Sequence, residues 1–510
     1  MNATRALLTT SLAALCLGAS VQAQTLTRSN GVLGASADYV LNGDPGEFWI
    51  LLPSLNQGPT PLSIFSPGDT RVLEVGLDQI PLWSGGFLDG SGNDSQSYPL
   101  PNDASLQGLP VFAQAVTFPG NPFRVDDVFN ATGVVFGSSG TSTAPVGQPS
   151  DGWTGHTLTD LADGRALRAG GTFVNALGNS IATTGLETWD PQTGEWTTEA
   201  GAMSQQRAAH TATRLNDGRV LLAGGGDTNG LITATCDLFD PSTGTVSPTG
   251  AMNEARTQHT ATLLSDGRVL VVGGTDNFDF SDPLGALASV HASAEVYDPG
   301  TGGWTNVGGL PDPRVLHSAS LLGDGRVLVT GGIEVTFIFG VPFGAITDDA
   351  RVFNPATNGF QNVGDFGGER LAHPQLTLSD GRVLVAGGST GSLLTQVFTP
   401  RSDVWVFDPG TDSWSAGPTL GSPRVYGQLV EAGGDVLLLQ GLSTIDLTTL
   451  SGLPVLDVER TDTSLTPWSI AGTALAGHPL GLATAVDGDA RVLTVGDGDD
   501  GLTNAELFVR

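Results

Sequence analysis

The sequence predicts an all-β protein, most of which forms a seven-bladed β-propeller. Two observations carry this prediction. Paired glycines end apolar stretches at intervals of 49 to 58 residues, which is the length of one four-stranded propeller blade. The 72 glycines and 30 prolines among 510 residues favour many short strands joined by turns. The glycine pairs and their degenerate forms are Gly170-Gly171, Gly224-Gly225, Gly273-Gly274, Gly331-Gly332, Gly387-Gly388, Gln440-Gly441 and Val495-Gly496.

Each repeat unit has the same internal order. It opens with a strand of small residues, such as 210–215, and an Asp-Gly-Arg turn follows. Asp-Gly tolerates the positive φ angles of a tight hairpin. The second strand is almost wholly apolar, as at 269–272, which predicts a strand covered on both faces. After a connection of variable length, a third strand ends in Asp-Pro, and a fourth carries an aromatic residue such as Trp196 or Trp304.

These features resemble the Kelch-repeat family, which includes the propeller domain of galactose oxidase. The double glycine, the aromatic-Asp-Pro ending and the tryptophan six residues after the aspartate all match, over about residues 155–510. The resemblance implies the fold and says little about function. It does not extend to the oxidase's copper site, which needs tyrosine and histidine ligands and a Tyr–Cys crosslink. The propeller has only two tyrosines, Tyr297 and Tyr426, and one cysteine, Cys236, so we expect no cofactor and no metal.

The ends of the chain predict how the propeller closes and what precedes it. The last unit stops at Arg510, after its third strand, and Ser142 precedes His156 by the 14 residues that separate Trp196 from His210. We therefore expect residues 141–147 to supply the missing fourth strand of a propeller that spans 141–510; an ordinary linker is the alternative. Residues 24–140 predict a small all-β, sandwich-like domain. Residues 1–23 have the charge, the apolar run and the small residues of a signal peptide.

Composition narrows the classes of partner. The formal net charge is −31 and all 21 basic residues are arginine, which makes nucleic acid and anionic membranes poor partners. No segment after the signal peptide is long and apolar enough to span a membrane. After cleavage near Gln24 the single remaining cysteine, Cys236, excludes a disulfide framework. We expect a monomer that is secreted, periplasmic or at the cell surface, and that binds an unidentified protein or glycan.

A histidine recurs at the start of the first strand in six units. A residue repeated in every blade is most simply interpreted as making the same hydrogen bond in each blade. A ring of imidazoles that binds metal is the alternative. The column consists of His156, His210, His259, His317, His373 and His478.

An arginine stands three residues before this histidine in four units and before Gly427 in a fifth, and the odd spacing places the two side chains on opposite faces of an extended chain. In Kelch propellers this position commonly lines the partner-binding mouth, so the resemblance implies a ligand-binding role. The alternative is that the arginines form salt bridges with acids of the blades. The column consists of Arg207, Arg256, Arg314, Arg370 and Arg424; Trp153 and Leu475 replace the arginine in the first and last units.

Aromatic residues are the remaining candidates for ligand binding. Because strand direction alternates, the connections between second and third strands lie at the same end of the propeller as the connections between blades. In the fourth unit this connection carries Phe337, Phe339 and Phe343, and neighbouring units carry Phe278, Phe280 and Phe398. Aromatic residues in adjacent loops predict an exposed apolar contact patch. Loops that fold over the rim are the alternative.

We therefore expect a secreted binding scaffold without catalytic residues. One alternative is a carbohydrate-active enzyme, such as a periplasmic Kelch-type sugar epimerase, in which arginines hold a substrate carboxylate near Glu334 or Glu369. A second alternative is a structural component of an envelope or matrix. The acidic loop at 496–501 has carboxylates for Ca²⁺ but not the EF-hand spacing, so an ordinary loop is favoured.

Overall fold

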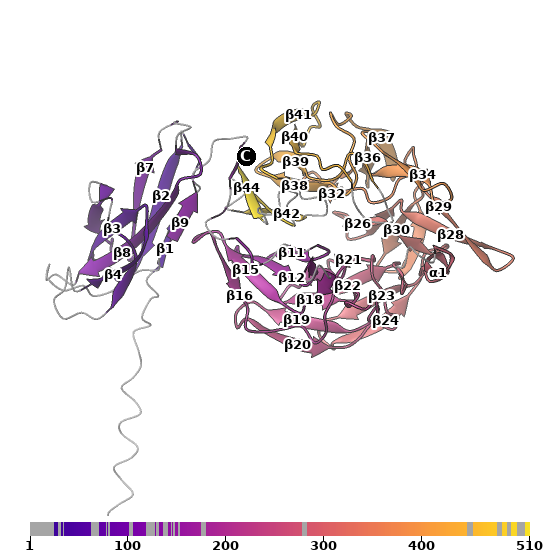
Figure 1. Ribbon diagram of the computed structural model, residues 1–510, viewed down its shortest axis with the longest axis horizontal. Helices are drawn as coiled ribbons and strands as arrows, with labels where there is room; N and C mark the ends of the chain where they lie inside the picture. Colours follow the sequence, from indigo (N-terminus) through magenta and orange to yellow (C-terminus); the bar gives the residue numbers. More distant parts are fainter. Residues whose placement is uncertain are drawn as a thin grey trace, which may run out of the picture. The chain divides into compact units, whose positions relative to one another are not determined.

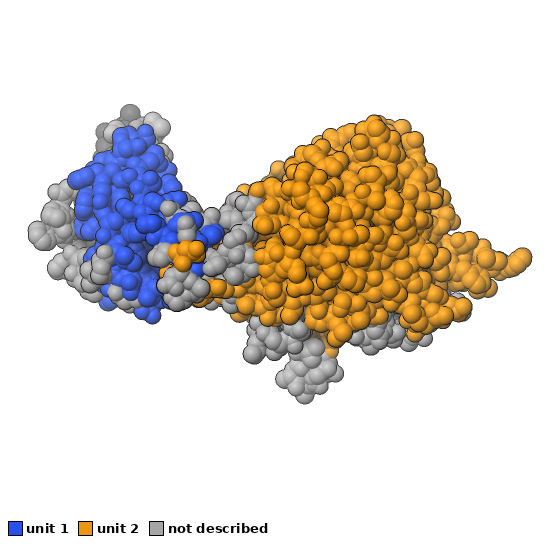
Figure 2. Space-filling view, turned by 90° about the horizontal axis from the view of Figure 1, so that it is seen from above, with its two compact units in different colours: residues 1–101, 109–134 blue, residues 102–108, 135–510 orange. Residues whose placement is uncertain are grey.

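The computed structural model describes residues 25–509 apart from several segments, of which the longer are 63–70, 119–127, 136–140, 175–179, 278–282, 446–451, 477–481, 487–490 and 497–504. The predicted signal peptide, His478 and most of the acidic loop lie outside the described residues. The chain divides into two compact units, one of residues 1–101 and 109–134 and one of residues 102–108 and 135–510 (Figure 2).

The smaller unit consists of antiparallel sheets. A three-stranded sheet runs β1 (Thr25–Arg28), β2 (Ser36–Asn42), β7 (Asn93–Pro99). A four-stranded sheet runs β6 (Ser84–Phe87), β3 (Phe48–Ser54), β8 (Pro110–Phe118), β9 (Thr132–Val135), and β4 (Gln57–Pro61) pairs with β5 (Val72–Val75). Strands β3 and β8 pair along seven residues and bury Trp49, Leu51 and Ala113, which form part of this unit's own core.

The larger unit is a β-propeller whose sheets follow the order predicted for the repeat. We number the repeat units along the chain, and in units 1 to 5 four strands pair in sequence as antiparallel neighbours. Unit 1 consists of β11 (Thr157–Asp160), β12 (Ala166–Ala169), β15 (Leu186–Asp190) and β16 (Glu195–Thr198), and unit 2 of β17 (Thr211–Arg214), β18 (Val220–Ala223), β19 (Cys236–Asp240) and β20 (Thr245–Thr249). Unit 3 consists of β21 (Thr260–Leu263), β22 (Val269–Val272), β23 (Ala294–Asp298) and β24 (Gly303–Val307), and unit 4 of β26 (Ser318–Leu321), β27 (Val327–Thr330), β30 (Ala350–Asn354) and β31 (Gly359–Asn362). Unit 5 consists of β32 (Gln375–Thr377), β33 (Val383–Ala386), β36 (Val404–Asp408) and β37 (Ser413–Ala416).

The last two units share one eight-stranded sheet. Its order is β38 (Gln428–Ala432), β39 (Asp435–Leu439), β40 (Asp457–Asp462), β41 (Ser469–Thr473), β10 (Thr141–Thr143), β44 (Ala505–Val509), β43 (Arg491–Val495), β42 (Leu482–Val486). Strand β10 pairs antiparallel with β44 and touches β41 in parallel at Thr141 and Thr473. The first strands of successive units contact one another in order, and β42 of the last unit contacts β11 of the first (Figure 1). The ring of inner strands is therefore closed.

Neighbouring units cover both faces of each sheet. Every residue of β18 and β22 is buried, and one core cluster joins Leu167 and Leu186 of unit 1 to Val220 and Phe239 of unit 2. Sheets stacked in this way leave no polar face, which is the reason that the second strands are continuously apolar.

The paired glycines are required by the same stacking. Gly224 and Gly225 adopt φ angles of +69° and +91°. A Cβ on Gly224 would lie 2.8 Å from the His259 ring of the next unit, and one on Gly225 would lie 2.8 Å from the Cβ of His210. Glycine fits here because it has no Cβ and tolerates positive φ.

Several connections between second and third strands contain regular secondary structure, although the sequence indicated only connections of variable length. They form the hairpins β13 (Thr172–Val174)–β14 (Ser180–Ala182), β28 (Ile333–Ile338)–β29 (Val341–Ile346) and β34 (Ser389–Ser392)–β35 (Val397–Pro400), and the short helix α1 (Pro283–Ala288). Strand β25 (Arg314–Val315) pairs with the base of β28. We call the end of the propeller that carries these connections the loop-bearing face, and the end that carries the Asp-Gly-Arg turns the turn-bearing face.

Candidate interaction face

The five arginines predicted to bind a ligand are buried, which corrects the expectation that they are exposed at the mouth. The side chains of Arg207, Arg256, Arg314, Arg370 and Arg424 are each 0% exposed. Each guanidinium forms an ion pair with an acid of its own unit, at an N–O distance of 2.5 to 2.8 Å. The partners, in the same order, are Asp237, Glu295, Asp349, Asp403 and Glu459. The sequence left two interpretations open, and the structure agrees with the second one, in which the arginines form salt bridges within the blades.

Backbone contacts complete the arginine environment and link the units. Arg256 Nη1 donates to the carbonyl of Gly273, 2.7 Å away in its own unit. The carbonyl of Arg256 accepts a hydrogen bond from the N–H of Gly225, in the unit before. The same two contacts recur at Arg207, Arg370 and Arg424, with Gln440 in place of the glycine for the last. The arginine column therefore links each unit to its predecessor, and the Nη groups of these arginines donate their hydrogen bonds within the fold.

The acid of the pair does not occupy one sequence position. In units 2, 3 and 6 it is the second residue of the third-strand repeat, as at Glu295. In units 4 and 5 that position holds Arg351 and Trp405, and the acid stands two residues earlier, at Asp349 and Asp403. A shift of two residues keeps the carboxylate on the same face of a strand. This displacement hides the pairing from a simple column-by-column comparison of the repeats.

Three of the described histidines form the repeated hydrogen bond expected from their column. His210, His259 and His317 place Nε2 3.0 to 3.2 Å from a threonine hydroxyl in the first strand of the preceding unit. Burial and, to a lesser extent, the nearby guanidinium of Arg314 lower the pKa of His317 to about 3. Burial likewise holds the pKa values of His210 and His259 well below the usual range. These imidazoles are therefore neutral side chains of the interfaces between units.

The aromatic candidates lie on hairpin β28–β29, and they are exposed. Phe337, Phe339 and Phe343 are 49%, 103% and 53% exposed. The base of the hairpin is anchored, because Ile333 and Val335 belong to a buried cluster beneath the loop-bearing face. Phe278 and Phe280 lie outside the described residues. Loops folded over the rim are thus not what the structure shows for this hairpin, which projects from the propeller in Figure 1.

Further exposed apolar side chains lie on the same kind of connection in other units. They include Leu231 in unit 2, Leu394 in unit 5 and Leu453 in unit 6, which are 70%, 94% and 64% exposed. These leucines cannot be singled out from the sequence, because a single leucine in a loop carries no periodic signal. Ten of the twelve exposed large apolar residues described in the larger unit stand on connections between second and third strands. The connections on the loop-bearing face therefore carry most of these exposed apolar side chains.

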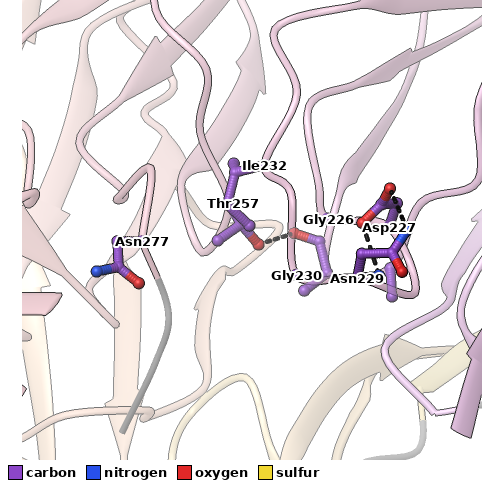
Figure 3. A pocket seen from close by; sticks show the side chains of 9 residues that line it. Gly226, Asp227, Asn229, Gly230, Ile232, Thr257 and Asn277 are labelled. Carbon is purple, nitrogen blue, oxygen red and sulfur yellow. Dashed lines mark hydrogen bonds between the residues drawn. The ribbon is translucent and has the colours of Figure 1, made fainter. Parts of the chain in front are cut away.

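A pocket of about 480 Å³ opens where units 2 and 3 meet on this face (Figure 3). Its walls include Ala208, Ala209 and Gly226. At the positions of Ala209 and Gly226, unit 4 carries the larger Leu316 and Ile333. Unit 2 therefore has small residues and an open space where unit 4 has larger side chains. Asp227, Asn229 and Asn277 supply polar atoms on its walls.

The described part of the chain has no cluster of three or more His, Cys, Asp or Glu side chains arranged to hold a metal ion. The hydroxyl of Tyr297 lies 2.7 Å from the hydroxyl of Thr249 and forms a hydrogen bond with it. Cys236 is buried and its thiol is free. In the same described part, no helix has the length and apolar character needed to cross a membrane.

Comparison with known proteins identifies the repeat. The family model described as the Kelch motif matches residues 370–421, which begin at Arg370 and include the four strands of unit 5. Unit 5 is a Kelch repeat. The Kelch repeats support a role for the propeller as a protein-interaction scaffold.

Two curated proteins are similar to this chain in sequence. The chain is 26% identical over 205 residues to beta-scruin of Limulus polyphemus, a match that covers 39% of this chain and 22% of that protein. It is 30% identical over 205 residues to Kelch-like protein 34 of Homo sapiens, a match that covers 40% of this chain and 29% of that protein. The matches thus span less than a third of either relative. The solved structure titled "Structure of YjhT" is 14% identical, with a TM-score of 0.47, over 63% of this chain and 98% of that one.

Proposed function

We propose that this protein is a secreted scaffold that binds a protein partner through the loop-bearing face of its Kelch propeller. The observation that carries the proposal is the concentration of exposed apolar side chains on the connections of this face. Apolar side chains kept in water at many neighbouring points cost solubility, and they usually mark a contact surface. The signal-peptide pattern at 1–23 supports secretion.

The turn-bearing face offers a contrast. Its Asp-Gly-Arg turns pair each aspartate with the arginine of the same turn, for example Asp217 with Arg219 at 2.6 Å and Asp266 with Arg268 at 2.7 Å. These charged groups are solvated and satisfied locally, so this face has little to gain from a partner. The difference between the two ends supports binding at the loop-bearing face.

The proposal is tested with two triple variants of the full chain. One replaces Leu231, Leu394 and Leu453 with serine, and the matched control replaces Asp217, Asp266 and Asp380 with asparagine. A partner is first identified by recovery with the unchanged protein from its native extracellular fraction, and is then purified and titrated. We expect the leucine variant to bind roughly 10- to 100-fold more weakly, because apolar contact area is lost. Equal affinity of the leucine variant, or weakened binding only in the aspartate variant, would refute the proposal.

A further inference from the structure

The tip of hairpin β28–β29, residues 337–343, breaks the pattern of its own base. At the base one face is core and the other is polar: Ile333 and Val335 are buried, whereas Glu334 pairs with Arg314 and Thr336 is exposed. This alternation is expected of a strand with one covered face. Beyond Thr336 the alternation of apolar and polar residues ends, although the strands continue.

Both faces of the tip are apolar. The register pairs Phe337 with Pro342 and Ile338 with Val341, so the first pair projects from one face and the second pair from the other. Phe337, Ile338 and Val341 are 45% to 49% exposed. A hairpin that rests on a flat surface covers one face only. Apolar side chains on both faces indicate that the tip is enclosed by whatever it binds.

Phe339 at the turn is unfavourable in two independent ways. Its φ angle is +49°, a left-handed conformation in which a bulky residue is an outlier. Its side chain is 103% exposed, so the phenyl ring is fully in water. Asn, Asp or Gly would relieve both costs at this position, which with Gly340 forms the two-residue turn. Backbone outliers of this kind are characteristic of functional sites.

We propose that residues 337–343 insert into an uncharged apolar cleft of a partner protein, with Phe339 as the anchor at the bottom of the cleft. This inference rests on the proposed function and specifies the element and the partner chemistry. The stretch 335–345 contains no charged residue, although the chain carries a net charge of −31, so the matching surface is uncharged. A single buried aromatic anchor surrounded by smaller contacts is typical of protein interfaces.

The open edges of the hairpin favour a protein over a lipid bilayer. Strand β25 pairs only with Glu334 and Ile333, and among the described residues neither β28 nor β29 pairs with a third strand beyond Val335. Backbone groups on these edges need hydrogen-bond partners once water is removed. A protein cleft can supply them by strand addition, whereas the hydrocarbon core of a bilayer cannot.

The first test separates binding from folding with one matched pair of variants. Phe339→Asn is compared with Gln396→Asn, because Gln396 has a φ angle of +55° in the corresponding connection of unit 5. Asparagine suits this conformation, so we expect both variants to melt at or above the temperature of the unchanged protein. Only Phe339→Asn should weaken binding of the purified partner, by at least ~30-fold. A lowered melting temperature for Phe339→Asn alone would show that the ring is structural and would overturn the proposal.

The second test identifies what surrounds the tip. Benzophenone-bearing phenylalanine is placed at position 339, and at 396 as the control, in the full chain within its native setting. We expect irradiation to give one discrete protein adduct from 339 that maps to uncharged apolar residues of the partner, and none of that mass from 396. No adduct, an adduct to a second copy of this chain, or an adduct to lipid would each overturn the proposal. So would binding of phosphatidylcholine vesicles that Phe339→Asn abolishes.

The two proposals fail in different ways. If the triple leucine variant loses the partner and Phe339→Asn does not, the loop-bearing face binds but the hairpin is not its anchor. If neither set of changes affects the partner, the proposed function itself is wrong.

Discussion

At the scale of single residues, the most consequential finding is that charged side chains hold the propeller together from within. Arg256 and Glu295 are both fully buried, and their ion pair is supplemented by hydrogen bonds from Arg256 Nη1 to the carbonyls of Gly273 and Ser293. Removing water from two charges is costly, and the pair is stable only because each charge compensates the other. These positions are therefore far more sensitive to loss of one partner than exposed pairs are.

The arginine column gives the first prediction at this scale. Arg256→Met keeps most of the side-chain volume and leaves Glu295 as a buried charge without its cation. We expect the free energy of unfolding, measured with urea, to fall by about 3–5 kcal/mol. Arg268→Met is the control, because its pair with Asp266 is partly exposed and is worth about 1 kcal/mol or less. Equal losses in the two variants would contradict the structural role assigned to the column.

The histidine column predicts how stability depends on pH. His317 has a pKa of about 3 in the folded protein, and its ordinary value in an unfolded chain is about 6.5. Below pH 6.5 the unfolded state therefore binds more protons than the folded state, and stability falls as the pH is lowered from 6.5 towards 3. The loss is roughly 1.4 kcal/mol per pH unit for each such histidine.

Urea unfolding between pH 7.5 and pH 4.5 measures this loss. In His317→Gln the amide can still form a hydrogen bond with Thr260. The slope of unfolding free energy against pH should then be smaller by the contribution of one histidine, roughly 1.4 kcal/mol per pH unit. An unchanged slope would mean that His317 does not titrate in this way.

At the scale of elements, the repeats differ from one another mainly in what they carry on the loop-bearing face. Stacking between neighbouring units requires the same kind of residue at each position of the four-stranded core, so equivalent core residues of different units are similar. The connections are not constrained by that stacking, and they range from the projecting hairpin of unit 4 to the pocket of unit 2. Variation is concentrated where contacts with other molecules are available.

The pocket of unit 2 gives a prediction about equivalent residues of different units. Gly226 lacks a positive φ angle, and a Cβ there would meet only the flexible end of Ile232. Gly226→Thr copies Thr275 of unit 3, and we expect its melting temperature to stay within a few degrees of that of the unchanged protein while the pocket is filled. Gly225→Ala is the contrast, because its φ angle is +91° and its Cβ would lie 2.7 Å from the carbonyl of Ala208. It should destabilise the fold by more than about 2 kcal/mol. Comparable melting curves would refute this account.

At the scale of the whole molecule, the ring is joined by residues far apart in the sequence. Strand β10 lies between β44 and β41 in one sheet, so a segment near residue 142 is paired with the end of the chain. Pairing of this kind satisfies strand edges that would otherwise attract other chains.

Closure by β10 predicts a specific sensitivity at Ser142, which is buried and stands opposite Phe508. Proline at this position has no N–H to donate and does not fit between two paired strands. Ser142→Pro should therefore lower the urea midpoint of the full chain substantially, by a free energy of about 3 kcal/mol. Ser142→Ala, which keeps the N–H, should have a small effect. If the two variants unfold at the same midpoint, β10 does not contribute to closure.

The sequence by itself determined the repeat, the order of strands in each unit and the hydrogen-bonding role of the histidines. These features follow from local turn chemistry and from periodic burial, and both leave a signal at fixed spacing. Glycine pairs such as Gly224-Gly225 are visible because only glycine fits where one unit packs on the next. The exposed phenylalanines of β28–β29 were also found, because three aromatic residues in one connection are conspicuous.

Only the tertiary structure decided which candidate side chains are exposed and which are buried. Arg370 is fully buried because Asp403 folds back to it from 33 residues away, and this acid stands two residues before the position that carries it in unit 3, as Asp349 does in unit 4. Spacing along a strand specifies the face on which a side chain lies, but whether that face meets solvent or a carboxylate depends on residues distant in the chain. For the same reason the exposure of Phe339 and the small residues that open the pocket became meaningful only once the units were packed together.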